Sequence, residues 1–446
     1  MLKINLFVAL LVLSSAVFAQ QNASEVRLIT LDPGHFHAAL VQKTMIERLS
    51  PVVHVYAPAG TDLDEHLKRI DAYNTRPQNP TRWQEKVYRG ADFFQKMIAE
   101  KQGNVVVMAG NNRKKTEYIY NTVKAGMNVL ADKPMCIDTK GYELLKKAFA
   151  TAKQNKVLLY DIMTERSEIT TVLQKELSQL PAIFGTLEKG TPDNPAIIKE
   201  SVHHFFKFVS GSALKRPAWF MDVNQQGEGV VDVTTHLVDL VQWAAFPGTI
   251  LSTTDVQLTN AKRWTTPMTR SQFATITGLN DFPDYLRQHV KDSVLYIYAN
   301  GEINFRLKGV QAKVRVLWNY STPEGGDTHY SIMRGTKANL EIRQGKAEKF
   351  VPQLFIKPLK VSDAEISQAF EGLKAKFPGI NLKKQGNEWL VEIPDKYRTG
   401  HEAHFGEVLE RFMSYQAAGQ LPEWEVPNML VKYYTTTKAL ELAKKK

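Results

Sequence analysis

The sequence contains one cysteine, Cys136, so no disulfide can form within the chain and the fold must be held by its core. It also lacks internal repeats and long Ser, Gly, Pro or single-charge tracts, which argues against disorder. Hydrophobic residues make up 43% and charged residues 23% of the 446 residues. Such a chain is expected to form two or three globular domains.

Clustered positive charge is also scarce, although the formal net charge is +11. The densest basic clusters, 113–115 and 444–446, are short, and the other basic residues are scattered. A solvated basic face explains this pattern, so we expect no nucleic-acid partner.

The only long apolar run lies at the N-terminus, and it is too short to span a bilayer comfortably. Lys3 precedes the apolar residues 4–13, and an A-x-A-like sequence ends at Ala19. Residues 1–19 therefore resemble a signal peptide rather than an uncleaved anchor or a buried helix. We expect export to a bacterial periplasm, without stable membrane insertion.

Residues 20–160 alternate short apolar runs with amphipathic stretches. The expected strands are 26–31, 52–56, 104–108, 128–130 and 157–160, and the expected helices are 38–49, 64–73, 91–99, 115–125 and 140–154. This order predicts a Rossmann domain, a doubly wound parallel sheet in an α/β protein.

Residues 161–446 show longer strands with period-two alternation, which is typical of a sheet with one open face. The expected strands are 183–189, 203–209, 293–298, 303–307, 313–320 and 330–333, and the expected closing helices are 402–416 and 428–443. We expect a C-terminal α+β domain with a large, mostly antiparallel, open-faced sheet. Residues 350–396 look like an elaboration of it.

The first strand-to-helix turn is where a Rossmann domain binds the diphosphate of a dinucleotide. Here the turn contains Gly34, His35, Phe36 and His37, and of the G-x-G-x-x-G pattern only Gly34 is present. Asp32 replaces the first glycine and His37 the third, although both histidines are also compatible with capping or core roles. The acidic residue expected after the second strand is represented only by the late Asp62 and Asp64, so NAD and NADP both remain possible.

Two distant segments resemble the Gfo/Idh/MocA oxidoreductases, named for glucose-fructose oxidoreductase and inositol dehydrogenase. Asn112 matches the last residue of the family's T-P-N turn, and Asp132-Lys133-Pro134 resembles its E-K-P motif. Further along, the sequence from Gly227 to Asp239 resembles G-G-G-x-x-x-D-x-x-x-H-x-x-D, with Asp232 and His236 at the matching positions. The resemblance covers nearly all of the mature chain.

The resemblance implies a catalytic group of Lys133, Asp232 and His236. By analogy, His236 is the general base, Asp232 orients it or binds substrate, and Lys133 binds the substrate hydroxyl and the nicotinamide. Hydride transfer from an alcohol needs such groups, and an ordinary histidine pKa near ~6.5 suits a proton acceptor. The implied cofactor contacts are Gly34, His35, Phe36, His37, Asn112, Asp132, Lys133 and Pro134.

Other polar residues are candidates for substrate contact. Arg166 lies where the family often has an arginine near the substrate, and His204, Lys207 and Trp219 are further candidates. A metal site built from His203, His204, His401 and His404 is conceivable, but no spacing specific for metal ligands occurs, so we expect no metal.

We therefore expect a periplasmic NAD(P)-dependent oxidoreductase that transfers hydride to or from a ring hydroxyl of a sugar, glycoside or polyol. Its cofactor should be tightly bound, because a periplasm holds little free nicotinamide nucleotide. The resemblance also implies a homodimer or homotetramer formed through the C-terminal sheet. One alternative is an NAD-dependent glycosidase that works by oxidation and elimination, and another is a cofactor-less carbohydrate-binding protein.

Overall fold

The computed structural model describes residues 25–209, 212–322 and 326–445. The expected signal peptide, residues 1–19, lies outside these ranges. Among the described residues, no helix combines the length and apolar character needed to cross a membrane.

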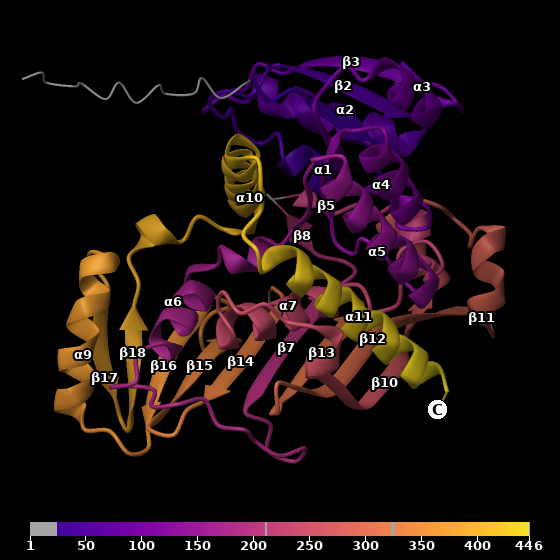
Figure 1. Ribbon diagram of the computed structural model, residues 1–446. Coiled ribbons are helices and arrows are strands. Elements are labelled where there is room, and N and C mark those ends of the chain that lie inside the picture. Colours follow the sequence, from indigo (N-terminus) through magenta and orange to yellow (C-terminus); the bar gives the residue numbers. More distant parts are fainter. Residues whose placement is uncertain (1–24, 210–211, 323–325, 446) are drawn as a thin grey trace, which may run out of the picture.

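The N-terminal half contains a six-stranded sheet in the order β3-β2-β1-β4-β5-β6, with every neighbouring pair parallel. This half, in indigo and purple, lies at the top of Figure 1. Its strands are β1 (Leu28–Leu31), β2 (Val52–Ala57), β3 (Gln84–Arg89), β4 (Val105–Met108), β5 (Asn128–Asp132) and β6 (Leu159–Ile162). The short apolar runs form β1, β4 and β6, whose residues are all buried, as expected for a sheet covered on both faces. This strand order confirms the predicted doubly wound fold.

The first helix differs from the prediction. The expected helix 38–49 is wrong, because α1 (His37–Leu40) ends after four residues. The carbonyl oxygens of Gln42 and Lys43 accept hydrogen bonds from the side chains of Trp83 and Arg76, at 2.6 and 2.7 Å. Strand β3 was also missed. The other helices of this half are α2 (Thr61–Thr75), α3 (Phe93–Glu100), α4 (Lys115–Lys124) and α5 (Thr139–Gln154).

A second, larger sheet has the order β10-β12-β13-β7-β14-β15-β16-β18-β17, with β11 paired to β12. All of its pairs are antiparallel except β7 with β13, which confirms the predicted mostly antiparallel sheet. The strands are β7 (Ile197–His204), β10 (Val256–Thr269), β11 (Val290–Lys291), β12 (Val294–Leu307), β13 (Val310–Asn319), β14 (Thr328–Arg334), β15 (Ala338–Gln344), β16 (Gln353–Pro358), β17 (Asn381–Gln385) and β18 (Glu388–Glu392). The short strands β8 (Phe208–Val209) and β9 (Ser212–Ala213) pair separately.

Several strand predictions need correction in this sheet, including the strand expected at 203–209, since β7 ends at His204 and β8 begins only at Phe208. Residues 183–189 form a turn around Gly185, whose φ is +73°, and β10 was missed. The two runs expected at 293–298 and 303–307 belong to one strand, β12. Gly301 lies inside that strand because Val230 packs against it, and a Cβ there would lie 2.7 Å from the Val230 side chain.

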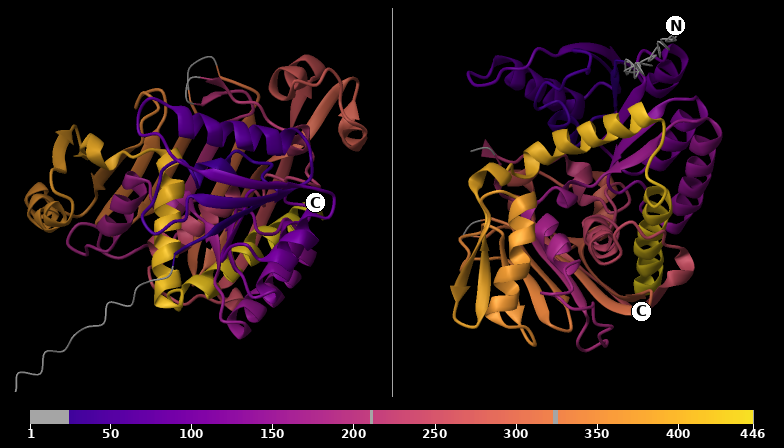
Figure 2. Two further views of the ribbon diagram at one scale, coloured as in Figure 1. Left: turned by 90° about the horizontal axis from the view of Figure 1, so that it is seen from above. Right: turned by 60° about the vertical axis from the view of Figure 1, so that its left-hand side comes forward.

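Helices α6 (Ile169–Ser178), α7 (Thr234–Ala245) and α11 (Glu425–Lys444) pack on the large sheet, and α8 (Arg270–Thr277) lies beside β10. The elaboration, residues 350–396, extends the sheet with β16, β17 and β18 and adds α9 (Asp363–Lys376). Helix α10 (His401–Ala418) turns back to the parallel sheet, where Phe405 and Phe412 join its core (Figure 2). A boundary near residue 160 therefore separates the two sheets along the chain. The core of the parallel sheet, however, also contains residues that follow this boundary.

Candidate active site

The centre of the site is an ion pair that joins the two halves of the chain. Lys133 Nζ lies 2.7 Å from Asp232 Oδ1, although the residues are 99 positions apart, and both side chains are largely buried. Lys133 follows β5, and its peptide bond to Pro134 is cis. Asp232 lies in the turn before α7. Two of the three residues that the resemblance assigned to catalysis are thus in direct contact.

Gly229 places this turn against the large sheet. Its N–H donates to Tyr298 O at 2.9 Å, and a Cβ on Gly229 would lie 1.9 Å from Ala299 O. No other residue type allows so close an approach of two backbones. Gly229 therefore allows the turn that carries Asp232 to lie close against the large sheet.

His236 lies in the first turn of α7 and is buried. Among the described residues, its Nδ1 has no hydrogen-bond partner. Burial and the charge of Lys133 lower the pKa of His236 to about 4, so its imidazole is neutral at pH 7. A neutral imidazole with an uncommitted nitrogen can accept a proton, but the lowered pKa makes His236 a weaker base than the ordinary value near ~6.5 assumed from the sequence.

Three backbone N–H groups of the turn after β1 already have acceptors within the protein. Gly34 N–H donates to Asp32 O at 2.9 Å, His35 N–H to Ala109 O at 3.1 Å, and His37 N–H to His35 Nδ1 at 3.3 Å. Asp32 adopts a positive φ of 49°, and burial together with Asp62 raises its pKa to about 6. Helix α1 is too short to supply a strong dipole at this turn.

Trp219 and Asp62 close the space above Gly34. Trp219, in the 3₁₀ turn η2 (Ala218–Met221), donates from Nε1 to Asp62 Oδ2 at 2.7 Å. A Cβ on Gly34 would lie 2.8 Å from that oxygen and 3.0 Å from the Trp219 ring. Asp62, the late candidate for ribose binding, therefore contacts the second domain.

Asn112 makes a further contact between the domains. Its Nδ2 donates to Gln226 O at 2.7 Å, its N–H donates to Gln225 O at 2.9 Å, and its buried Oδ1 lacks a partner among the described residues. The crevices next to Asp232 and Asp32 have volumes of about 20 and 10 Å³, which is little more than room for one water molecule. A ligand larger than a water molecule therefore does not fit in either crevice without movement of the residues that line it.

The predicted cofactor residues His35, His37 and Asp132 lie together. His37 Nδ1 is 2.9 Å from Asp132 Oδ2, and the rings of His35 and His37 have centroids 4.0 Å apart. Phe36 stacks on His35, at 4.7 Å between centroids. Burial lowers the pKa of both histidines well below the usual value, so both are neutral.

Two predicted substrate residues, His204 and Lys207, meet at Asp327, which sequence reasoning missed. His204 Nδ1 and Lys207 Nζ lie 3.1 and 2.7 Å from its carboxylate oxygens, and His203 Nδ1 lies 3.2 Å away. Burial opposes ionisation, but the hydrogen bonds from His203 and His204 hold the pKa of Asp327 well below its usual range. Asp327 follows no recognisable motif, so only the fold reveals this cluster.

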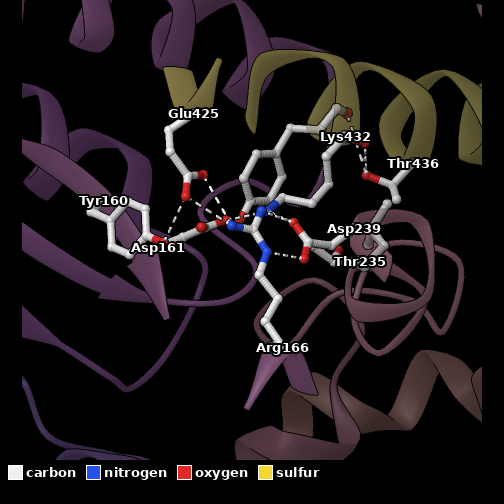
Figure 3. Close-up of polar contacts among 10 residues, drawn as sticks. Tyr160, Asp161, Arg166, Thr235, Asp239, Glu425, Lys432 and Thr436 are labelled. Atoms are coloured by element: carbon white, nitrogen blue, oxygen red, sulfur yellow. Dashed lines mark hydrogen bonds and ion pairs between the residues drawn. The ribbon is translucent and has the colours of Figure 1, made fainter. Parts of the chain in front are cut away.

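Arg166 does not lie with the other predicted substrate residues. It ends the 3₁₀ turn η1 (Thr164–Arg166), where it bonds through Nε and Nη2 to Asp239 and through Nη1 to Glu425 (Figure 3). Lys432 completes this buried network with contacts of 2.8 Å to Asp239 and 2.7 Å to Asp161. Because all three guanidinium nitrogens are engaged, we assign Arg166 to the domain junction rather than to substrate.

The four histidines considered for metal binding lie in separate surroundings. His203 and His204 contact Asp327, whereas His401 Nδ1 lies 3.5 Å from Glu165 and its ring is 6.4 Å from that of His404. They form no common site.

Residues 173–444, more than half of the chain, match the family described as "Putative oxidoreductase C terminal domain". The chain belongs to this oxidoreductase family. No curated protein matches it. It is 56% identical to a solved "putative oxidoreductase" from Parabacteroides merdae ATCC 43184, with a TM-score of 0.92 over 95% of this chain and 98% of that one.

More distant solved structures share the family's fold. Levoglucosan dehydrogenase, in complex with NADH and levoglucosan, is 13% identical, with a TM-score of 0.60 over 95% of this chain and 98% of that one. The WlbA dehydrogenase from Bordetella pertussis, in complex with NADH and UDP-GlcNAcA, is 13% identical, with a TM-score of 0.58 over 95% and 96%. These neighbours are Gfo/Idh/MocA-type oxidoreductases, which confirms the resemblance seen in the sequence.

The fold implies a nicotinamide dinucleotide. The residues at the expected nicotinamide end and those at the expected diphosphate end differ in how well they fit this cofactor. The redox end fits, because a buried cation, Lys133, and a neutral histidine with an unpartnered nitrogen, His236, lie at the domain junction. The diphosphate end fits only after Trp219 and Asp62 separate, because they cover Gly34.

Proposed function

We propose that this oxidoreductase transfers hydride to or from a ring hydroxyl of a sugar, glycoside or polyol, using NAD or NADP. The observation that carries the proposal is the buried Lys133–Asp232 ion pair, 2.7 Å long, with the neutral His236 on the adjoining helix. The proposal also rests on the family match and on the sugar complexes of the distant structural neighbours.

Each of the three residues has a role in the proposed reaction. The Lys133 ammonium group binds the reacting oxygen and stabilises negative charge on it, while Asp232 holds the ammonium group in place. His236 accepts the hydroxyl proton on its free Nδ1 during oxidation and returns it during reduction. The nicotinamide, when bound, supplies the hydride acceptor or donor.

The surroundings of Asp232 suit a sugar. Phe205, Phe220 and Trp318 line the small crevice beside it, and aromatic faces pack well against the apolar faces of sugar rings. The cluster of His204 and Lys207 around Asp327 offers donors for further hydroxyls. We propose these residues as the substrate side of the site.

Location, cofactor retention and assembly complete the proposal. We propose that the protein is exported to the periplasm and retains its nucleotide tightly. We also propose that it forms a homodimer or homotetramer through the large sheet. Oxidation followed by elimination, giving net hydrolysis of a glycoside, would begin with the same step. Product analysis with an aryl glycoside distinguishes it from net oxidation.

One observation favours the cofactor-less carbohydrate-binding alternative. Three N–H groups of the turn after β1 already have acceptors within the protein, and Trp219 and Asp62 cover the turn. The same chain nevertheless retains Lys133, Asp232 and His236 in contact or on adjoining elements, which a binding protein does not need.

The deciding experiment measures nucleotide bound to the protein purified from the periplasm, together with hydride transfer to a panel of glycosides. We expect about one NAD or NADP per chain, and Lys133→Met should lower kcat by roughly 1,000-fold, because an oxyanion loses its cation. Lys376→Met is the matched control, since Lys376 pairs with Glu176 at the surface, at 2.8 Å. Absence of nucleotide both from the purified protein and in titrations would support the binding protein instead.

A further inference from the structure

Three side chains with metal-binding atoms meet at the carboxyl end of the parallel sheet. They are His35, in the turn after β1, His37, the first residue of α1, and Asp132, the last residue of β5. One ligand atom from each lies within 4.8 Å of the others. Strand β4 lies between β1 and β5, so the fold brings together two segments that are 95 residues apart at His37 and Asp132.

The donor set is chemically specific. Two imidazoles and one carboxylate form the protein ligands of catalytic zinc sites and of non-haem ferrous sites. We propose that His35, His37 and Asp132 bind one divalent first-row transition-metal ion. Three protein ligands leave at least one coordination position for water or a substrate oxygen.

The three ligands are held by rigid backbone. His35 N–H donates to Ala109 O at 3.1 Å, and Asp132 is paired with Ile162 in the sheet. His37 and Asp132 are buried, and a short hydrogen bond of 2.9 Å joins them. A metal ion needs this pair to move slightly apart and any wider pair among the three, which lie within 4.8 Å of one another, to close, because ligand atoms around zinc lie roughly 3.3 Å apart when bound at about 2.0 Å.

A purely structural role accounts for less of the geometry. The hydrogen bond between His37 and Asp132 needs only those two residues, and His37 N–H donates to His35 Nδ1 at 3.3 Å, but neither contact requires the His35 ring to lie edge to face with the His37 ring, with centroids 4.0 Å apart. The inference also explains the unusual turn, since His37 stands where the dinucleotide pattern has its third glycine.

Two cations near the cluster are already engaged. Lys133 pairs with Asp232, and Lys115 Nζ donates to the backbone oxygen of Asp132 at 3.2 Å. The carboxylate of Asp132 is therefore free of direct ion pairing with either lysine in the contacts described. Their positive charge weakens metal binding but does not occupy the ligand atoms.

The inference goes beyond the proposed redox function, and its test contains no nucleotide. The full chain is stripped with a chelator and titrated with Zn²⁺ by calorimetry and with Co²⁺ by visible absorption. We expect one ion per chain, with Co²⁺ bands typical of nitrogen and oxygen ligands. His35→Asn, His37→Asn and Asp132→Asn should each weaken Zn²⁺ binding by roughly 100-fold or more, since each replaces an imidazole or a carboxylate by a neutral amide, which is a poor zinc ligand.

His204→Asn is the matched control, because His203 and His204 also flank an aspartate, Asp327, at 3.2 and 3.1 Å. This variant should bind Zn²⁺ as the parent chain does. Circular dichroism identifies any variant that fails to fold, and His35→Asn, at the least buried position, then decides alone. The inference is overturned if the folded parent chain binds neither ion, or if His35→Asn leaves the Zn²⁺ affinity unchanged.

Discussion

The indole of Trp219 donates a hydrogen bond of 2.7 Å to Asp62, directly over the glycine of the turn after β1. Trp219 belongs to the second domain and Asp62 to helix α2 of the first. The contact joins the domains at the place where the fold implies a diphosphate. Asp62 also raises the pKa of Asp32 to about 6, after the larger effect of burial, so two acidic groups face this space.

Breaking this contact should improve access for dinucleotides. Trp219→Phe keeps an aromatic ring but removes the N–H donor, and Asp62→Asn removes the charge that repels phosphate. Because a hydrogen bond to a charged group contributes about 1.5–3 kcal/mol, we expect each variant to bind NAD or NADP roughly 10-fold more tightly in calorimetry.

Trp389→Phe is the control for this change, since Trp389 Nε1 also bonds to an aspartate, Asp363, at 2.9 Å in the elaboration. It should leave nucleotide affinity unchanged. Equal affinity in the parent chain, Trp219→Phe and Asp62→Asn would show that the contact does not limit binding.

The network around Arg166 should dominate the stability of the domain junction. Arg166→Met leaves the carboxylates of Asp239 and Glu425 buried without their main cation, although Lys432 still contacts Asp239. Breaking a buried ion pair in this way costs about 3–5 kcal/mol, which urea unfolding measures. Arg89→Met, which removes an exposed pair with Asp64, should cost about 1 kcal/mol or less. A similar loss in both variants would contradict the role assigned to Arg166.

Lys199 is a fully buried lysine in β7 whose ammonium group donates to Gln174 Oε1 and Ser331 Oγ, at 3.1 and 2.8 Å. Burial lowers its pKa from 10.5 to about 7. Between these values the unfolded chain binds a proton that the folded chain does not, so folding weakens as the pH falls from 10.5 to 7 and then stays level.

Lys199→Met should therefore gain stability over the parent chain as the pH is lowered from 10 to 7. The Ser331–Gln174 hydrogen bond, 3.0 Å long, can remain. Thermal unfolding at the two pH values measures the gain, and Lys313→Met, at a half-buried pair with Glu200, should show no comparable pH dependence. A gain that does not change with pH would rule out the buried charge as its cause.

His66 provides a pH test outside the site. It is buried in α2, and among the described residues neither ring nitrogen has a hydrogen-bond partner. Burial and Arg69 lower the pKa of His66 to about 4. Between pH 6.5 and 4 the unfolded chain therefore binds a proton that the folded chain does not, so the stability of the fold decreases as the pH is lowered. The advantage of His66→Leu in urea unfolding should be larger at pH 4.5 than at pH 7.5. An advantage of the same size at both values would contradict this explanation.

The sequence alone determined the two sheets and the family, because these depend on local patterns. Alternating apolar runs and helices predicted the doubly wound order, and the motifs around Lys133 and Asp232 identified the oxidoreductase resemblance. Local patterns failed where distant side chains intervene. Helix α1 ends early because Trp83 and Arg76 bind the carbonyl groups that follow it.

Only the tertiary structure decided what each polar side chain touches. The sequence placed Arg166 near substrate, but Asp239 and Glu425, which are 73 and 259 residues away, engage its guanidinium. In the same way, Asp62 meets Trp219 across 157 residues, and His37 meets Asp132 across 95. Side-chain partners this far apart depend on how two domains pack, and no spacing along the chain encodes that packing.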